Sequence, residues 1–102
     1  MKFQLVLQFS ANDLTDFDEL IDLELALILV LDDDHDVDGH DFGSGEMNIF
    51  IHTNDPVEAF KKCETAIPEA LRPSLKAAYR EFSEDSYRWL YPEGISGCFQ
   101  IT

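Results

Sequence analysis

Between Lys2 and Lys61 the sequence contains no lysine or arginine, although aspartate and glutamate occur 15 times in that interval. Residues 61–102 hold six acids and six bases, so the net charge of −14 comes from the first 60 residues. Such a charge repels phosphate backbones and anionic lipid surfaces, and we therefore expect no nucleic-acid partner and no membrane partner. The same field speeds the encounter with basic proteins and with cations.

Cysteine is also scarce. Cys63 and Cys98 are the only two cysteines, which is too few for a disulfide scaffold, and no CxxC pair occurs. The apolar runs fall short of the roughly 18–20 residues of a membrane-spanning helix. The opening MKFQLVLQF has neither the charged region nor the apolar region of a secretory signal. These features predict a cytoplasmic protein with reduced thiols.

Length and composition predict one domain over residues 1–102. The 45% hydrophobic content is typical of a globular chain, and neither an internal repeat nor a long linker divides the sequence. Residues 2–9 alternate apolar and polar side chains, which predicts a half-buried strand.

A helix is expected next, capped by Asn12 or Asp13. Its predicted inward stripe consists of Phe17, Leu20, Ile21, Ile28 and Leu31. Residues 25–31 are apolar on all sides, so this end of the helix is either deeply buried or packs through Leu25 and Leu29 against another subunit. A strand over 25–31 is the alternative.

The segment from Asp55 to Glu58 has the signature of a helix start, with aspartate at the cap, proline in the first turn and glutamate three residues after the cap. Pro68 is expected to end this helix. The predicted buried stripe consists of Val57, Phe60, Cys63 and Ile67. Residues 74–82 are expected to form a strand, with a helix as the alternative, and residues 87–91 alternate again.

These elements follow the order β-α-β-β-α-β with an extra C-terminal strand. Two helices on one face of an antiparallel sheet in this order predict an α+β, ferredoxin-like sandwich. This fold carries many unrelated functions, so it predicts none by itself.

The segment 36–52 is expected to be a β-hairpin with a three-residue turn at Gly43-Ser44-Gly45. The predicted pairs are Phe42 with Glu46, His40 with Asn48, Asp38 with Phe50 and Asp36 with His52. The residues expected to face the core are Val37, Met47, Ile49 and Ile51. The residues expected on the opposite, helix-free face are Asp36, Asp38, His40, Phe42, Glu46, Asn48, Phe50 and His52, with Gln4 and Gln8 from the first strand.

This helix-free face is the candidate site. Its predicted ligand-binding residues are Asp36, Asp38, His40, Glu46, Asn48 and His52. Imidazole and carboxylate groups can hold a divalent metal, and the same groups can bind a small cationic or polar molecule. Alternatively, the face is solvated or covered by a second subunit, and Asp36 and His52 form an ordinary cross-strand contact. No catalytic residue is assigned, and a divalent metal is the only cofactor that the pattern suggests.

The nearest metal-binding motif lies in the Asp-rich segment 32–41. Asp34, Asp36, Asp38 and Gly39 match the first half of an EF-hand loop, but the closing glutamate, Glu46, falls one residue late. The residues that follow alternate as a strand rather than a helix, so an EF-hand is not expected. The candidate ligands of a divalent ion in this segment are Asp34, Asp36, Asp38 and His40.

The stretch VDGHDFGSGEMNIFIHTNDP at 37–56 resembles a group of small bacterial proteins of about this length. The likeness lies in the GHD-x-GSGEMNIFI hairpin, the Asp-Pro helix start that follows, and an ending like that from Trp89 to Pro92. The resemblance implies an α+β domain in the bacterial cytoplasm, and it implies no activity and no catalytic residue.

The leading functional hypothesis is a non-enzymatic binding or regulatory module that forms a homodimer and binds a basic protein or a small ligand. The interface would be the helix-free sheet face or the apolar end of the first helix. The alternative is a metal-dependent or acid–base enzyme with its site on the helix-free face. A purely structural, oligomerising domain is the third hypothesis.

Overall fold

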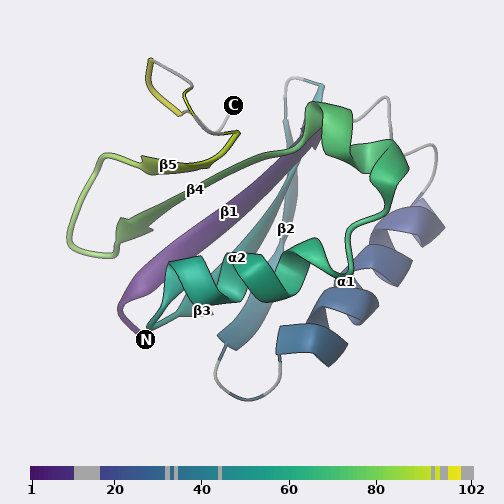
Figure 1. The fold of residues 1–102 in the computed structure, drawn as a ribbon, viewed down its shortest axis with the longest axis horizontal. Coiled ribbons are helices and arrows are strands. Elements are labelled where there is room, and N and C mark those ends of the chain that lie inside the picture. Colours follow the sequence, from purple (N-terminus) through teal and green to yellow (C-terminus); the bar gives the residue numbers. More distant parts are fainter. Residues whose placement is uncertain are drawn as a thin grey trace.

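Five antiparallel strands form one sheet in the order β2-β3-β1-β4-β5 (Figure 1). The computed structural model describes residues 1–10, 17–31, 33, 35–43, 45–92, 94 and 97–99. The strands are β1 (Phe3–Ser10), β2 (His35–Gly43), β3 (Glu46–Thr53), β4 (Lys76–Glu81) and β5 (Arg88–Tyr91), and the helices are α1 (Phe17–Leu31), α2 (Pro56–Glu64) and the 3-10 helix η3 (Glu69–Ser74). The predicted α+β class, the order of the main elements and the additional last strand are confirmed.

One face of the sheet packs against both α1 and α2. The odd-numbered residues of the central strand, Leu5, Leu7 and Phe9, point to this face and are fully buried, as their alternation predicts. They share one core with buried residues from both helices. Among the described residues, no helix is long and apolar enough to cross a membrane.

Helix α1 spans residues 17–31, which excludes the alternative of a strand over 25–31. Its buried stripe consists of Leu20, Leu23, Leu27 and Leu31. The prediction that Ile21 and Ile28 point inward is wrong, because the inward side follows the spacing 20, 23, 27 and 31 around the helix. The predicted caps Asn12 and Asp13, and the Phe17 side chain, lie outside the described residues.

Helix α2 begins as predicted. The Glu58 backbone N–H donates to the Asp55 carboxylate at 3.1 Å, and Pro56 occupies the first turn. Phe60 and Cys63 are buried as expected, but Val57 is 46% exposed, and Ala59 takes the inward place. The helix ends at Glu64, four residues before Pro68.

Aromatic side chains of the described C-terminal residues pack on the face of the sheet that lacks the long helices. Strand β4 forms over 76–81, so the strand prediction is confirmed and the helix alternative is wrong. The Phe99 ring contacts both Tyr87 and Trp89, with ring centroids 5.2 Å apart in each case. These rings pack near Val6 and Ala78, so this face carries a second apolar cluster and is less polar than the sequence suggests.

The β2–β3 hairpin departs from the predicted register. Asp36 pairs with His52 and Val37 with Ile51 as expected, but the register shifts between Val37 and Gly39, which makes Asp38 a bulge. Beyond the bulge His40 pairs with Ile49 and Phe42 with Met47. The predicted pairs of His40 with Asn48, Asp38 with Phe50, and Phe42 with Glu46 are therefore wrong.

A glycine permits this bulge. Gly39 has a φ of 153°, a conformation that residues with a side chain rarely adopt. One extra residue changes which face every later side chain occupies, because side chains alternate with a period of two. The bulge therefore decides where the predicted site residues lie.

Candidate functional site

The bulge separates two histidines that the sequence places together. His40 turns to the helix side of the sheet, where its Nδ1 forms an ion pair with Glu24 of α1 and its ring stands edge-on to Phe42. His52 follows the buried Ile51 in β3 and therefore points to the opposite face. The predicted site with both imidazoles on one face is not formed.

Three of the predicted residues do converge on that opposite face. Asp36, Asp38 and His52 each offer a ligand atom, and these atoms lie within 4.8 Å of one another. His52 Nε2 is 3.6 Å from Asp38 Oδ2, and Asp36 is the direct cross-strand neighbour of His52. One imidazole and two carboxylates form a donor set suited to a divalent transition metal.

The remaining predicted residues lie elsewhere. Glu46 is at the far end of β3, six residues from His52, which corresponds to about 20 Å along a strand. Asn48 is fully buried, and its Oδ1 accepts a hydrogen bond from Gln8 Nε2 at 3.0 Å. Asp34 lies outside the described residues.

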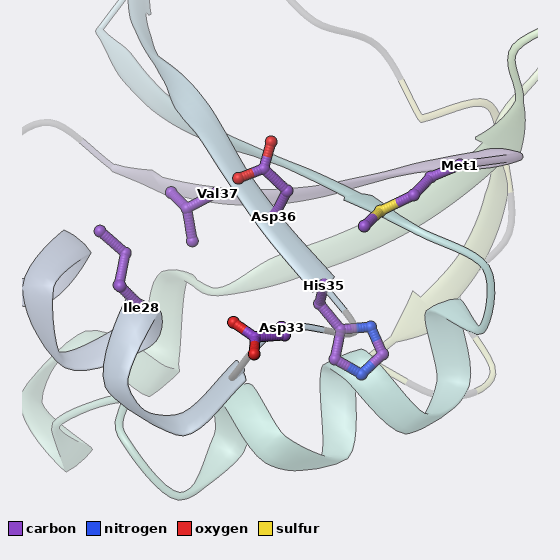
Figure 2. A pocket seen from close by; sticks show the side chains of 6 residues that line it. All are labelled: Met1, Ile28, Asp33, His35, Asp36 and Val37. Atoms are coloured by element: carbon purple, nitrogen blue, oxygen red, sulfur yellow. The ribbon is translucent and has the colours of Figure 1, made fainter.

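A histidine that the sequence analysis did not select is buried at the edge of the sheet. His35, the first residue of β2, is only 5% exposed. Its side chain points to the helix side of the sheet, and its cross-strand neighbour in β3 is Thr53. It lines a cavity of about 420 Å³ at the β2 edge of the sheet, with Met1, Ile28, Asp33, Asp36 and Val37 (Figure 2). Figure 2 shows the His35 ring on the side of β2 that faces the helices and Asp36 pointing away from it.

A second cavity of about 310 Å³ adjoins the first at Met1, Asp33 and His35. Its other lining residues are Asn54, Asp55 and Glu58. The alternation of β2 contained a signal for this site, because His35 lies two residues before the core-facing Val37.

The His35 ring is held from one side only. Its Nδ1 lies 2.6 Å from Thr53 Oγ1, which also accepts a hydrogen bond from the Asp55 backbone N–H at 2.9 Å. Nε2 is buried and has no hydrogen-bond partner among the described residues, and Glu58 Oε1 lies 4.0 Å away. A buried polar atom without a partner is destabilising unless a ligand or water satisfies it.

Helix α1 presents an exposed apolar surface, which we call the α1 apolar face. It consists of Ile21, Leu25, Ile28 and Leu29. Their spacing of four, seven and eight residues places them on one side of the helix, and Leu29 is 83% exposed. Every charged residue of α1 is acidic, namely Asp18, Glu19, Asp22 and Glu24.

Neither cysteine is among the described residues of these sites. Burial, and then the neighbouring Glu64 charge, raises the pKa of the Cys63 thiol to about 12. Cys63 is therefore a core residue that stays protonated at neutral pH, whereas Cys98 is exposed.

Comparisons with family models, with curated protein sequences and with solved structures gave no match. The resemblance of residues 37–56 to small bacterial proteins therefore stays a prediction, and the functional argument rests on the geometry of this chain.

Proposed function

We propose that this protein is a non-enzymatic binding module that recognises a basic protein partner through the α1 apolar face. The observation that carries the proposal is the exposure of four large apolar side chains on a helix whose charges are all negative. Exposed apolar patches rimmed by polar groups are typical of protein-binding surfaces. A partner with an apolar stripe flanked by lysines or arginines would complement both the patch and its rim.

Charge favours a basic partner over a second copy of the chain. Two copies, each with a net charge of −14, would bring acidic α1 helices together. The adjacent sheet edge is also poorly suited to pairing, because β2 carries a bulge and exposed aspartates. The homodimer expected from the sequence therefore becomes an alternative outcome of the experiment below.

The test uses a synthetic amphipathic peptide with leucines on one helical face and lysines on the other. We expect fluorescence anisotropy to show saturable binding that weakens as NaCl rises from about 0.05 to about 0.3 M. Replacing Leu25 and Leu29 together with glutamine should weaken binding at least about tenfold, because central apolar contacts dominate interfaces. Val57→Gln, an exposed apolar residue of α2, is the matched control and should leave the affinity unchanged.

Two results would count against the proposal. Equal weakening by Val57→Gln would show that binding is not specific to α1. A dimer in sedimentation equilibrium that the Leu25 and Leu29 substitutions dissociate would assign the α1 apolar face to a second copy instead.

A second candidate function is divalent-metal binding, supported by the convergence of Asp36, Asp38 and His52. We expect Zn²⁺ or Mn²⁺ to raise the melting temperature, because an ion that binds only the folded state stabilises it. Asp38→Asn should abolish this shift, and Asp41→Asn, an exposed acid of the same strand, should preserve it. No shift with either ion, or equal loss in both variants, would contradict a metal site.

We also propose a specific strand arrangement within the α+β class and a cellular location. Strand β1 lies between β3 and β4, and β3 lies between β1 and β2, which supports a ferredoxin-like arrangement with β5 added at one edge. The acidic composition and the two unpaired cysteines support a location in the bacterial cytoplasm.

A further inference from the structure

The two adjoining cavities around His35 combine negative charge with a buried nitrogen that has no partner. Asp33 lines both cavities, and Asp55 and Glu58 line the second. His35 lines both cavities, and its Nε2 is buried and makes no hydrogen bond. The acids exclude an anionic ligand, whereas a hydrogen-bond donor with a positive charge would satisfy both the nitrogen and the carboxylates.

We propose that these cavities bind a primary ammonium group carried on a short alkyl chain. The ammonium would donate hydrogen bonds to His35 Nε2 and to Glu58 Oε1. Glu58 lines the second cavity, and Ile28 and Val37 supply apolar wall for the alkyl chain in the first, which adjoins it at Met1, Asp33 and His35. This site goes beyond the proposed docking at α1 and does not require it.

The separation of the two acceptors favours an ammonium over a metal ion. His35 Nε2 and Glu58 Oε1 are 4.0 Å apart. A nitrogen about 2.8–2.9 Å from each would subtend an angle of about 90°, which ammonium N–H bonds can meet with slightly bent hydrogen bonds. A metal ion needs bonds of about 2.0–2.2 Å, so these two atoms could bind it only at an angle of about 130–180°, which is wider than a tetrahedral site has.

Thr53 fixes the ring for this role. When His35 Nδ1–H donates to Thr53 Oγ1, across the observed 2.6 Å, Nε2 is left with its lone pair as an acceptor, on the side where Glu58 Oε1 lies 4.0 Å away. Glu58 already contacts Lys62 Nζ at 3.4 Å, but this is a partly exposed pair along one helix and contributes little. In its observed position the carboxylate therefore remains available to a cation inside the cavity.

The experiment follows the imidazole ¹⁵N signals of the full-length protein during titration with n-butylammonium chloride at constant ionic strength. The signals are assigned with the His40→Gln and His52→Gln variants. We expect a saturable shift of the His35 signals with n-butylammonium and none with n-butanol or Na⁺. The proposal is overturned if n-butanol or Na⁺ shifts these signals as strongly, or if n-butylammonium leaves them unchanged.

Two variants distinguish binding through the Glu58 carboxylate from general attraction of the cation to an acidic protein. Glu58→Gln should weaken n-butylammonium binding about tenfold, the effect of losing one charge-assisted hydrogen bond. Glu69→Gln removes the same charge from an exposed residue of η3 and should leave the affinity unchanged. Equal weakening in both variants would show only general attraction to the acidic protein and would overturn the site.

Two further titrations identify the source of the ammonium group. If the lysine-bearing amphipathic peptide displaces n-butylammonium, the group is a lysine side chain of a protein partner. If the peptide binds without displacing it, or does not bind at all, the site serves a free alkylamine. Failure of peptide binding thus refutes docking at α1 alone, whereas failure of n-butylammonium binding refutes the cavity site alone.

Discussion

Helices α1 and α2 pack on the same face of the sheet, but the surfaces that they present to solvent differ chemically. Helix α2 follows the rules for a solvent-facing helix, with a capped N-terminus, glutamate in its first turn and Lys61 and Lys62 in its last. Helix α1 has no basic residue in its last turn and leaves large apolar side chains exposed. Since both helices bury one complete stripe, the apolar surplus of α1 is not needed for the core, and it is the feature on which the proposed docking surface rests.

The largest expected effect is a difference in the free energy of unfolding between substitutions on the buried side and on the exposed side of α1. Leu27→Ala should lower the free energy of unfolding by about 2–5 kcal/mol, because it opens a cavity at a fully buried position. Leu29→Ala should change it by no more than about 0.5 kcal/mol, because that side chain is 83% exposed. Urea denaturation measures both, and similar losses in the two variants would mean that Leu29 also supports the core.

The thiol of Cys63, on the buried side of α2, makes the stability of the protein depend on pH. The pKa of Cys63 is raised from 9.0 to about 12 in the folded protein, so the unfolded chain loses this proton first. Between about pH 9 and pH 12 the folded state therefore binds more protons, and stability falls as pH rises by an amount on the order of 1–3 kcal/mol.

Comparison with Cys63→Ala isolates this contribution, because other groups titrate alike in both proteins. Urea denaturation at a series of pH values should show the stability advantage of the natural protein present below pH 9 and shrinking toward pH 12. A difference that stays constant across this range would contradict the assigned cause.

The smallest expected effect on the free energy of unfolding comes from removing the N-terminal cap of α2. Asp55→Ala removes the acceptor of the Glu58 N–H and should cost about 1 kcal/mol of the free energy of unfolding. Asp85→Ala, an acid in the β4–β5 connection, serves as the control for lost charge. An equal loss in the control would show that α2 does not depend on its cap.

Local sequence signals predicted the elements well. The alternation of residues 2–9, the Asp55 cap and the strand over 76–81 all depend on neighbours along the chain, so they could be read without the fold. The predictions for Ile21, Ile28 and Val57 failed because helical spacing gives two adjoining apolar sides in such segments, and only packing selects the buried one.

The candidate sites were only partly predictable. Asp36 and His52 were paired correctly because they precede the bulge, and Asp38 joins them as the bulged residue. His40 was misplaced because one extra residue reverses the facing of all later positions in β2. Gly39 was the available signal, since glycine inside a strand often marks a bulge.

The sequence alone determined the order of helices and strands, the acidic first half and the inward side of β1, because periodicity and charge are local properties. The tertiary structure decided which apolar side of α1 stays exposed, which face His40 occupies and that His35 is buried with one nitrogen unpaired. Those outcomes depend on contacts between distant segments, and a single bulge or a small rotation of a helix changes them without altering any local pattern.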